Sequence, residues 1–529
     1  MANRNQNMEH EPLLARAKSA DNLSSTTAEP TAGTKWLFFT TITPKYRWIP
    51  LLGCAIIFIN EAEYFVKQVA TMRAIEAMYC YEFWLKRNSP LADLGKHIPE
   101  RLCKDDSIQK DLAKTAGLIM FVRMLSAMIG AIPLGWVADR YGRKTVIVLH
   151  KVNVCINCAT WVVLYTAFPK VPIWTLYLSG LPGLIGGNYD IGLAMLFASY
   201  TDVMPSATER ASLFFLTTSM QYFAQTFCPP IGAWLMNLDG NSGTPQVNLM
   251  VSLYLAIFTA LISIFLFPET VHESREKRPV SGTASQIEEQ NGSDQIPNLK
   301  KSSRLERLMQ GFKDTVNGVG VINILLLSLS ICFAATGIKA IDWYAIVQYP
   351  VIKLDWTFPQ ASSVVSMQGF LMLIYFSIML PAINRILATW LGIKAGQFVI
   401  MACSALLLTV GALIIGLSNT TTLFITGVVI YLFGEGLPTA TQAYIVSLVD
   451  KSKVARVMAT LSIASIFGKL TASILFPKML ALGLDTHVDI LVGLPLFVSA
   501  VMFVVSAACI GVVGLRMRRA DRDQVVVER

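Results

Sequence analysis

The stretch Gly135-Trp136-Val137-Ala138-Asp139-Arg140-Tyr141-Gly142-Arg143-Lys144 is a short charged segment between two long apolar ones. Because glycine lacks a side chain, Gly135 and Gly142 allow close helix approach and a tight turn. Asp139 offers a carboxylate to a neighbouring helix end, and the segment closes with a basic cluster of Arg140, Arg143 and Lys144. Basic residues beside apolar spans mark the cytoplasmic side of a membrane. The stretch therefore predicts a cytoplasmic turn between two transmembrane helices.

The composition of the whole chain also indicates a membrane protein. Of its 529 residues, 53% are hydrophobic and 15% are charged, whereas a soluble domain carries about 25% charged residues. The mean hydropathy is +0.51. A helix needs about 20 mostly apolar residues to cross a bilayer. Twelve such stretches occur, six on each side of a polar break: 49–70, 115–137, 145–168, 173–200, 211–236, 248–267, 319–340, 362–387, 396–417, 423–449, 454–482 and 488–515.

The segment 135–144 resembles the Gly-x-x-x-Asp-Arg-x-Gly-Arg-Lys signature of the major facilitator superfamily, which lies between transmembrane helices 2 and 3. The resemblance implies an all-α integral membrane fold with twelve transmembrane helices in two pseudo-symmetric six-helix bundles. It also implies that Asp139 and Arg143 hold a cytoplasmic gate. In such proteins one half rocks against the other, so that a central site opens alternately to the two sides of the membrane.

The second half carries a faint echo of the signature at 385–394, after the eighth span. Gly392 and Lys394 match the second glycine and the lysine of the signature, while Thr389 replaces its aspartate. The internal repeat suits alternating access. Because the second segment lacks the aspartate, we expect the gate contacts of the second half to differ from those of the first half.

Polar tracts divide the chain into five expected segments. These are a disordered cytoplasmic N-terminal tail (1–45), an N-terminal six-helix bundle (46–270), a cytoplasmic central loop (271–315), a C-terminal six-helix bundle (316–516) and a cytoplasmic C-terminal tail (517–529). Low hydrophobicity with scattered charge is typical of disordered segments. No cleaved signal peptide is apparent in the first tail, so the first span is the expected insertion signal.

The net charge of +9 does not indicate a nucleic-acid partner. Basic residues gather before the first span, after the second, between the tenth and eleventh, and after the twelfth, which is one face of the membrane if the N-terminus is cytoplasmic. We therefore expect a multi-pass protein with both termini inside, in the plasma membrane. Residues 9–14 resemble an acidic dileucine sorting signal, which leaves a vacuolar or endosomal membrane open.

Nine cysteines are too few for a disulfide scaffold. Cys80 and Cys103 both lie in the expected long loop between the first two spans, which faces the non-cytoplasmic side, where oxidation is possible. We favour a bridge between them, the alternative being two free thiols. The Cys155–Cys158 spacing indicates two packed thiols within a helix, because no second pair lies within reach.

The fifth span carries a degenerate form of a helix-packing motif. Residues 224–233 resemble the Gly-x-x-x-Gly-Pro-x-x-Gly-Gly motif of drug/proton antiporters in the superfamily, with Pro229 and Gly232 matching outright. Small residues and a proline bend a helix and let it pack closely. The fourth span lacks the arginine that antiporters commonly carry there, so coupling through it is not expected.

The segment from the fourth to the fifth span supports a second resemblance, which competes with the one to drug/proton antiporters. Residues 186–190, 199–203 and 209–210 resemble the proton-coupled folate transporter family and its fungal relatives. Asp190 is expected in the cytoplasmic half of the fourth helix. A buried aspartate costs several kcal/mol unless it is paired or protonated, so Asp190 is either a proton carrier or a structural carboxylate.

Other ionisable residues inside the spans are candidates because charges are costly there. Glu435 and Lys469 are expected near the midplane, either as cavity residues or as a pair that neutralises itself. Glu61 and Arg123 complete the candidates for proton or substrate contact, and Asp190, Glu435 and Glu61 rank in that order as proton carriers. Two further pairs are expected to be structural: Glu63 with Lys67, four residues apart on one helix face, and Lys339 with Asp342 at an outer rim.

We expect a secondary active transporter, with proton-coupled efflux of a small organic compound, such as a drug or secondary metabolite, as the leading function. The placement rests on a resemblance to fungal efflux members of the superfamily, carried by Cys103-Lys104 and Pro268-Glu269-Thr270. The alternatives are a proton-coupled importer of an organic anion or cofactor, and a non-transporting receptor.

No Walker loop occurs and the five histidines lack metal-ligand spacing, so we expect no cofactor, no metal and no enzymatic activity. The expected partners are a small-molecule substrate, protons and the lipid bilayer, with the protein acting as a monomer.

Overall fold

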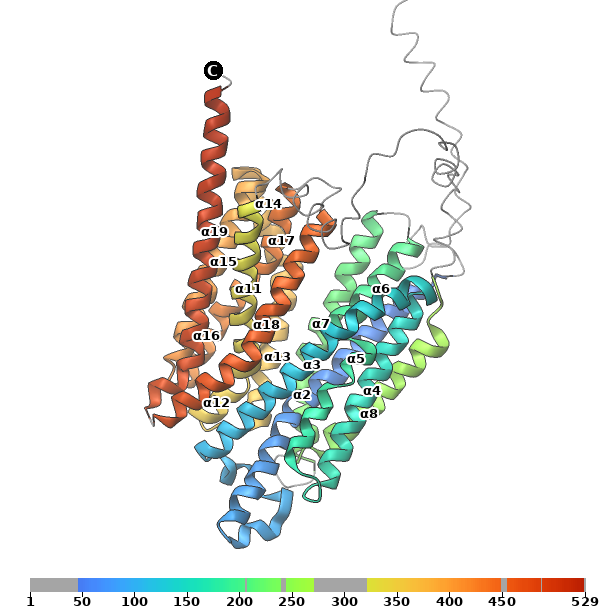
Figure 1. Cartoon of the computed structure of the whole chain (residues 1–529), viewed down its shortest axis with the longest axis vertical. Coiled ribbons are helices and arrows are strands. Elements are labelled where there is room, and N and C mark those ends of the chain that lie inside the picture. Colours follow the sequence, from blue (N-terminus) through green and yellow to red (C-terminus); the bar gives the residue numbers. More distant parts are fainter. Residues whose placement is uncertain are drawn as a thin grey trace, which may run out of the picture.

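The chain is described here from a computed structural model, which covers residues 46–204, 207–238, 244–270, 321–448, 454–486 and 488–527. Within these residues every regular element is a helix. The expected N-terminal tail, the sorting signal within it and the central loop 271–315 lie outside the described residues. Figure 1 shows two bundles of helices side by side. The N-half comprises residues 46–270, and the C-half comprises residues 321–527.

The described part of the N-half is built from long helices and several short ones. They are α2 (Ile49–Lys86), η2 (Pro90–His97), η3 (Glu100–Cys103), α3 (Asp106–Tyr141), α4 (Arg143–Ala167), η4 (Ile173–Gly180), α5 (Gly183–Gly186), α6 (Tyr189–Val203), α7 (Ala207–Met236), α8 (Gln246–Leu261) and η5 (Ile262–Leu266). The short helices η2 and η3 lie at the end that we name the disulfide end (Figure 1). The turn between α3 and α4 lies at the opposite end, which we name the signature end.

Helices of the C-half repeat this arrangement. They are α11 (Val321–Ala340), η6 (Ile341–Ala345), α12 (Gln348–Lys353), α13 (Phe358–Ile374), η7 (Tyr375–Met379), α14 (Leu380–Leu391), α15 (Ile393–Gly416), α16 (Thr421–Gly434), α17 (Leu437–Leu448), α18 (Val454–Asp485), η8 (Asp489–Gly493) and α19 (Leu494–Val527). The last helix therefore continues past residue 516, where we expected the C-terminal tail to begin.

Among the described residues, ten helices are long and apolar enough to cross a membrane. The all-α membrane fold is thus confirmed, while the expected count of twelve is not reached by this measure. The two expected spans outside the ten are the fourth and the fifth. The fifth is α7, which has 30 residues, but its threonines, serines and glutamines lower its mean hydropathy.

The fourth expected span, 173–200, is not one helix. It is divided into η4, α5 and α6 by interruptions at Leu181–Pro182 and at Gly187–Asn188. Proline lacks the N–H that a helix interior needs. Gly187 has a φ of +69°, which favours glycine. The apolar run was long enough to cross the membrane, but its proline and glycines break the helix.

The first expected span, 49–70, is too short. The structure continues this helix to Lys86, so α2 has 38 residues. Cys80 consequently lies inside α2 and not in the expected long loop, whereas Cys103 lies in η3 after it. The charged side chains of Arg73 and Glu76 are accommodated within this longer helix because they are buried and neutralise each other, with 2.9 Å between Nη1 and Oε2.

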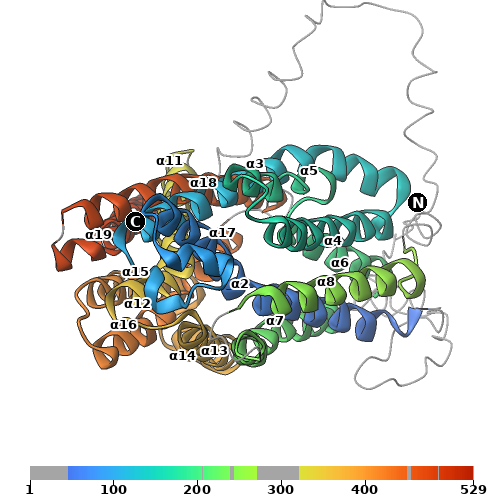
Figure 2. The ribbon, with the colours of Figure 1, turned by 90° about the horizontal axis from the view of Figure 1, so that it is seen from below.

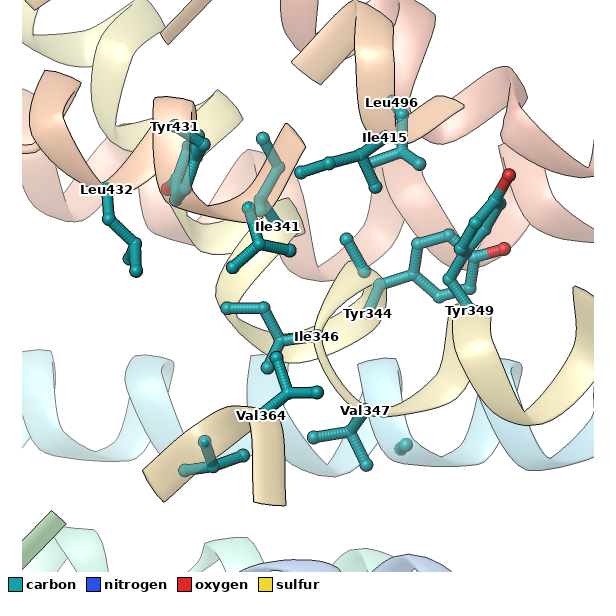
Figure 3. Packing of buried hydrophobic residues seen from close by; sticks show 14 of the residues in the cluster. Ile341, Tyr344, Ile346, Val347, Tyr349, Val364, Ile415, Tyr431, Leu432 and Leu496 are labelled. Carbon is teal, nitrogen blue, oxygen red and sulfur yellow. The ribbon is translucent and has the colours of Figure 1, made fainter. Parts of the chain in front are cut away.

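The C-half core forms around the irregular segment η6–α12, where the helix that begins as α11 loses its regular pitch. Figure 3 shows Ile341 of this segment near Ile415 and Tyr431 of neighbouring helices, and Ile346 and Val347 near Val364 of α13, all within one buried cluster. The hydroxyl of Tyr344 donates to the carbonyl of Val492 at 3.2 Å. An irregular backbone is tolerated at membrane depth only where protein groups surround it.

The two halves meet along two pairs of helices, α3 with α18 and α7 with α13, which lie at opposite edges of the interface in Figure 2. A Cβ at Gly117 of α3 would lie 2.5 Å from the carbonyl oxygen of Ser473 on α18. A Cβ at Gly369 of α13 would lie 2.7 Å from the backbone nitrogen of Thr226 on α7. Both contacts therefore require glycine.

The proline pair of α7 lies at the second of these contacts. Pro229 and Pro230 are inside the helix, and a proline leaves the carbonyl four residues earlier without its helical donor. Thr226 is the residue four positions before Pro230, and its carbonyl accepts the hydroxyl of Ser366 from the C-half. Gly232, one turn further on, would place a Cβ 3.2 Å from the Val66 carbonyl of α2. Of the two matched positions of the motif, Gly232 thus lies in a close helix contact.

At the disulfide end, Cys80 and Cys103 are joined by a disulfide, with their Cα atoms 5.3 Å apart. Both residues are fully buried. The bridge attaches η3 to the last turns of α2 and closes a loop with a sequence separation of 23 residues. It thereby fixes the part of the N-half that lies nearest to the start of α13.

We predict that the native protein carries this bridge. Cross-linking a loop of this length removes chain entropy worth about 3 kcal/mol from the unfolded state. Mass spectrometry of peptides prepared without reduction should therefore find residues 80 and 103 in one linked species. Alkylation of both thiols in the unreduced protein would contradict the prediction.

Candidate functional site

A cavity of about 300 Å³ lies where the two halves face each other. Its wall comes from both halves and contains charged groups of both signs: Glu61, Glu63, Lys67, Arg123 and Asp190 from the N-half, with Lys339 and Lys469 from the C-half. Aromatic side chains, including Tyr64, Trp161 and Tyr189, also line the cavity, together with neutral polar and aliphatic residues. Ionisable residues within membrane spans are costly and mark functional sites by default.

The broken fourth span shapes one side of this cavity, and a polar face of α4 supports it. His150 Nδ1 lies 3.2 Å from the carbonyl of Gly186, the amide of Asn153 donates to the carbonyl of Gly187 at 2.8 Å, and that of Asn157 donates to the carbonyl of Ser179 at 2.7 Å. These are carbonyls that the interruptions deprive of helical partners. Our sequence interpretation missed this support. The signal was the spacing of three polar residues, three and four apart, within an apolar helix.

On α2, the expected pair of Glu63 and Lys67 is present, with 2.5 Å between Oε1 and Nζ. Lys67 also donates to Asn157 at 3.1 Å, and the thiol of Cys158 donates to Glu63 at 2.9 Å. Glu61, a candidate proton carrier, lies in the first half of the long α2, lines the cavity and is 4% exposed. Its electrostatic partner is Lys151 of α4, so the acids on this wall are compensated.

Asp190 lies in the first turn of α6 and is not buried: 62% of its side chain is exposed. It faces Lys469 of α18 across the cavity, with 3.8 Å between Oδ2 and Nζ. Of the two alternatives stated for Glu435 and Lys469, the structure places Lys469 in the cavity wall, where it pairs with Asp190. The observed pair joins the N-half to the C-half, and such a contact depends on how the halves are packed.

Glu435 lies deeper in the C-half, directly after α16. It interacts electrostatically with Asp342 and Lys339, and one oxygen of each of the two carboxylates is buried without a hydrogen-bond partner among the described atoms. We expected Lys339 and Asp342 at an outer rim. Instead Lys339 lines the cavity and Asp342 lies behind it.

Arg123 of α3 is exposed in the cavity wall. Among the described residues, no carboxylate lies within ion-pair distance of its guanidinium. Lys339 lies close enough for Arg123 to repel it, and Lys469 repels Lys339 as well. Within the described part of the chain, Arg123 is therefore a cation without an acidic partner, beside two lysines that already have acidic neighbours.

The signature turn lies at the far end of α3. Its Gly142 has a φ of +104° and a ψ of 166°, a region of backbone conformation that is essentially restricted to glycine. The carboxylate of Glu269 accepts the backbone N–H groups of Arg143 at 3.1 Å and Lys144 at 3.2 Å. An acid is favourable at a helix N-terminus, and Glu269 supplies it to α4 from a segment that is distant in sequence.

Other signature residues are arranged around this turn. Arg143 pairs with Asp202 at 3.8 Å between Nε and Oδ2, and the guanidinium of Arg140 lies over the ring of Trp136 at 5.2 Å. Asp139 belongs to α3, but its side chain lies outside the described atoms. Gly392 in the echo has a similar backbone, with φ of +83°, although no atom lies within 4 Å of where its Cβ would be.

The sequence profile of the Major Facilitator Superfamily matches residues 106–393, more than half of the chain. The chain belongs to this superfamily of multi-pass membrane transporters. It is similar to the MFS efflux pump atnC of Emericella nidulans, at 24% identity over 87% of this chain and 85% of the relative. It is also similar to the efflux pump ustT of Aspergillus flavus, at 24% identity over 72% of this chain and 73% of the relative.

Solved structures share the fold. A point mutant of the nucleoside transporter NupG aligns with a TM-score of 0.57 at 13% identity over 88% of this chain and 99% of that chain. A D-xylose-proton symporter aligns with a TM-score of 0.57 at 14% identity over 87% of this chain and 96% of that chain. At these identities the likeness concerns the fold alone.

We predict that Gly142→Ala destabilises the protein more than the matched variant Gly392→Ala. Both substitutions force alanine into a backbone region that costs about 1–3 kcal/mol. At position 142 the new Cβ would also lie 2.2 Å from an oxygen of Glu269, which must move and lose its two hydrogen bonds to α4. Such bonds to a charged group are worth about 1.5–3 kcal/mol each.

Thermal unfolding of the two variants in detergent measures the difference. The Gly142→Ala protein should unfold at the lower temperature. Equal unfolding temperatures would show that Glu269 does not stabilise the turn.

Proposed function

We propose that this protein exports a small organic compound in exchange for protons by alternating access. The relatives named as efflux pumps support the direction of transport. The cavity between the halves supports a substrate site of small-molecule size. Both bundles belong to one chain, so a monomer suffices, and export from the cell requires the plasma membrane.

The observation that carries the coupling is the ion pair between Asp190 and Lys469. It joins α6 of one half to α18 of the other at 3.8 Å. Alternating access changes the separation of the halves, so the strength of this attraction differs between states. Protonation of Asp190 removes its charge and with it the attraction. A proton taken up here would therefore favour one conformation over the other.

We predict that Asp190→Asn abolishes extrusion driven by a pH gradient while substrate binding and passive exchange are retained, because asparagine cannot release a proton. Flux into inverted membrane vesicles, with and without an imposed gradient, measures this. Asp93→Asn is the matched control, because Asp93 is exposed in η2 at the disulfide end.

An Asp190→Asn protein that responds to the gradient as strongly as the wild type would exclude Asp190 as the proton carrier. Glu435 and then Glu61 would be the next variants. Glu435 has priority because its buried oxygen lacks a hydrogen-bond partner among the described atoms.

Arg123 favours a second candidate, the import of an organic anion together with protons. Its charge has no acidic partner among the described residues, and an anionic substrate would supply one. The sign of the coupling then follows from electrostatics. Protonation of Asp190 frees Lys469, which makes the cavity more positive and strengthens anion binding, so the proton and the anion travel together. A cationic or neutral substrate does not gain from a more positive cavity. Such a substrate instead fits the export proposed above, in which it is exchanged for protons.

Three probes of matched shape separate these functions: 1-naphthoate, 1-naphthamide and 1-naphthylmethylammonium. We predict for export that the amide or the ammonium compound leaves cells against a gradient and that protons move in the opposite direction. Accumulation of naphthoate with protons, weakened by Arg123→Gln and not by Arg101→Gln at an exposed position of η3, would replace export by import. Binding without flux of any probe would indicate a receptor.

A further inference from the structure

A buried carboxylate connects the two halves at the disulfide end. Glu100 of η3 is 2% exposed, and its Oε1 accepts the backbone N–H of Phe358 at 2.8 Å. Phe358 is the first residue of α13 in the C-half. The first N–H groups of a helix have no partner within the helix, and the positive end of the helix dipole favours an acid. Glu100 thus caps a helix of the opposite half.

A charged network within the N-half holds Glu100 in place. Lys104 pairs with Glu100 at 2.8 Å and with Glu76 of α2 at 3.0 Å. Its Nζ also lies 4.7 Å from the centre of the Phe358 ring. Glu76 is fully buried and is paired with Arg73, whose guanidinium donates to the carbonyl of Ile98 at 2.8 Å. The two acids and two bases compensate each other, so the network is neutral as a whole.

The disulfide ties this network to the backbone. Cys103 immediately precedes Lys104, and its bridge to Cys80 attaches η3 to α2. Gln109 of α3 donates both to the Cys103 carbonyl at 3.1 Å and to Glu76 at 2.7 Å. The carbonyl of the same residue accepts the side chain of Gln348 from the C-half at 3.2 Å. The bridge, the network and the contacts between the halves therefore form one continuous structure.

We propose that Glu100 is a latch that keeps the disulfide end closed, and that the Cys80–Cys103 bridge holds the latch in register with α13. Opening of this end requires the halves to separate here, which breaks the contact between Glu100 and Phe358. The latch presupposes the alternating access of the proposed function, but it depends neither on the substrate nor on the coupling ion. A protein without the latch spends more time open at the disulfide end.

Hydrogen–deuterium exchange of the full chain in detergent tests the latch without any transport assay. In Glu100→Ala the Phe358 amide loses its acceptor, and its peptide should exchange roughly ten- to a hundredfold faster, the factor expected for loss of a hydrogen bond to a charged group. The signature end should exchange more slowly, because the halves close there when they open at the other end. Glu82→Ala, in α2 near the same end, is the control.

Removal of the bridge provides an independent second measurement. The phosphine reductant TCEP converts the disulfide to two thiols and is itself oxidised to the phosphine oxide, and the double variant Cys80→Ser/Cys103→Ser mimics the product. Both should accelerate exchange at Phe358 and slow it at the signature end. Faster exchange confined to residues 90–104, or unchanged exchange at Phe358, would overturn the latch. Neither result would bear on export, which the probe fluxes test separately.

Discussion

Each backbone carbonyl that a broken helix releases inside the membrane needs a new donor, and the arrangement of the N-half depends on how this need is met. An unsatisfied polar group in hydrocarbon costs several kcal/mol. His150, Asn153 and Asn157 meet it from one face of α4. Their contacts allow the fourth span to be interrupted twice, and the second interruption places Asp190 at the start of a new helix beside the cavity. The charge site thus depends on neutral hydrogen bonds behind it.

The arrangement of the cavity also depends on charge compensation: a charged side chain within the membrane is costly unless an opposite charge lies beside it. Glu63 with Lys67 and Asp190 with Lys469 illustrate two ways of meeting it, one within a helix and one between the halves. The first pair can survive any movement of the halves, because both members belong to α2. The second cannot keep a constant geometry during such a movement. The two ion pairs are chemically alike, but only the second is sensitive to conformation.

Features determined by local sequence could be predicted well. The signature predicted the position of the turn, because the backbone conformation at Gly142 is essentially restricted to glycine. The four-residue spacing of Glu63 and Lys67 predicted that they pair on one helix face. The family and the all-helical membrane fold were predicted on the same basis and are confirmed. Pro182 and the glycines of the fourth span indicated a broken helix. We predicted one continuous span because the apolar run is long enough to cross the membrane.

Features determined by packing between distant segments could not be predicted. Lys469 pairs with Asp190 and not with Glu435 because of the way α18 faces α6. Glu269 reaches the signature turn from the end of the sixth span, and no periodicity records such a contact. The length of α2 was missed for a related reason: the partners of its buried charges, such as Lys104 beside Glu76, come from other segments of the chain.

The contact between Ser366 and the carbonyl of Thr226 has a mechanical consequence. Ser366 lies eight residues into α13, about 12 Å from its start, so this contact lies inside the interface and not at the rim of the disulfide end. When two rigid bodies rock, displacement grows with distance from the rotation axis, and contacts near the axis barely move. Pro230, which releases this carbonyl, and Gly369, which lets the helices approach it, thus provide a directional bond between the halves that resists their sliding along each other and is kept during rocking if the rotation axis passes close to it.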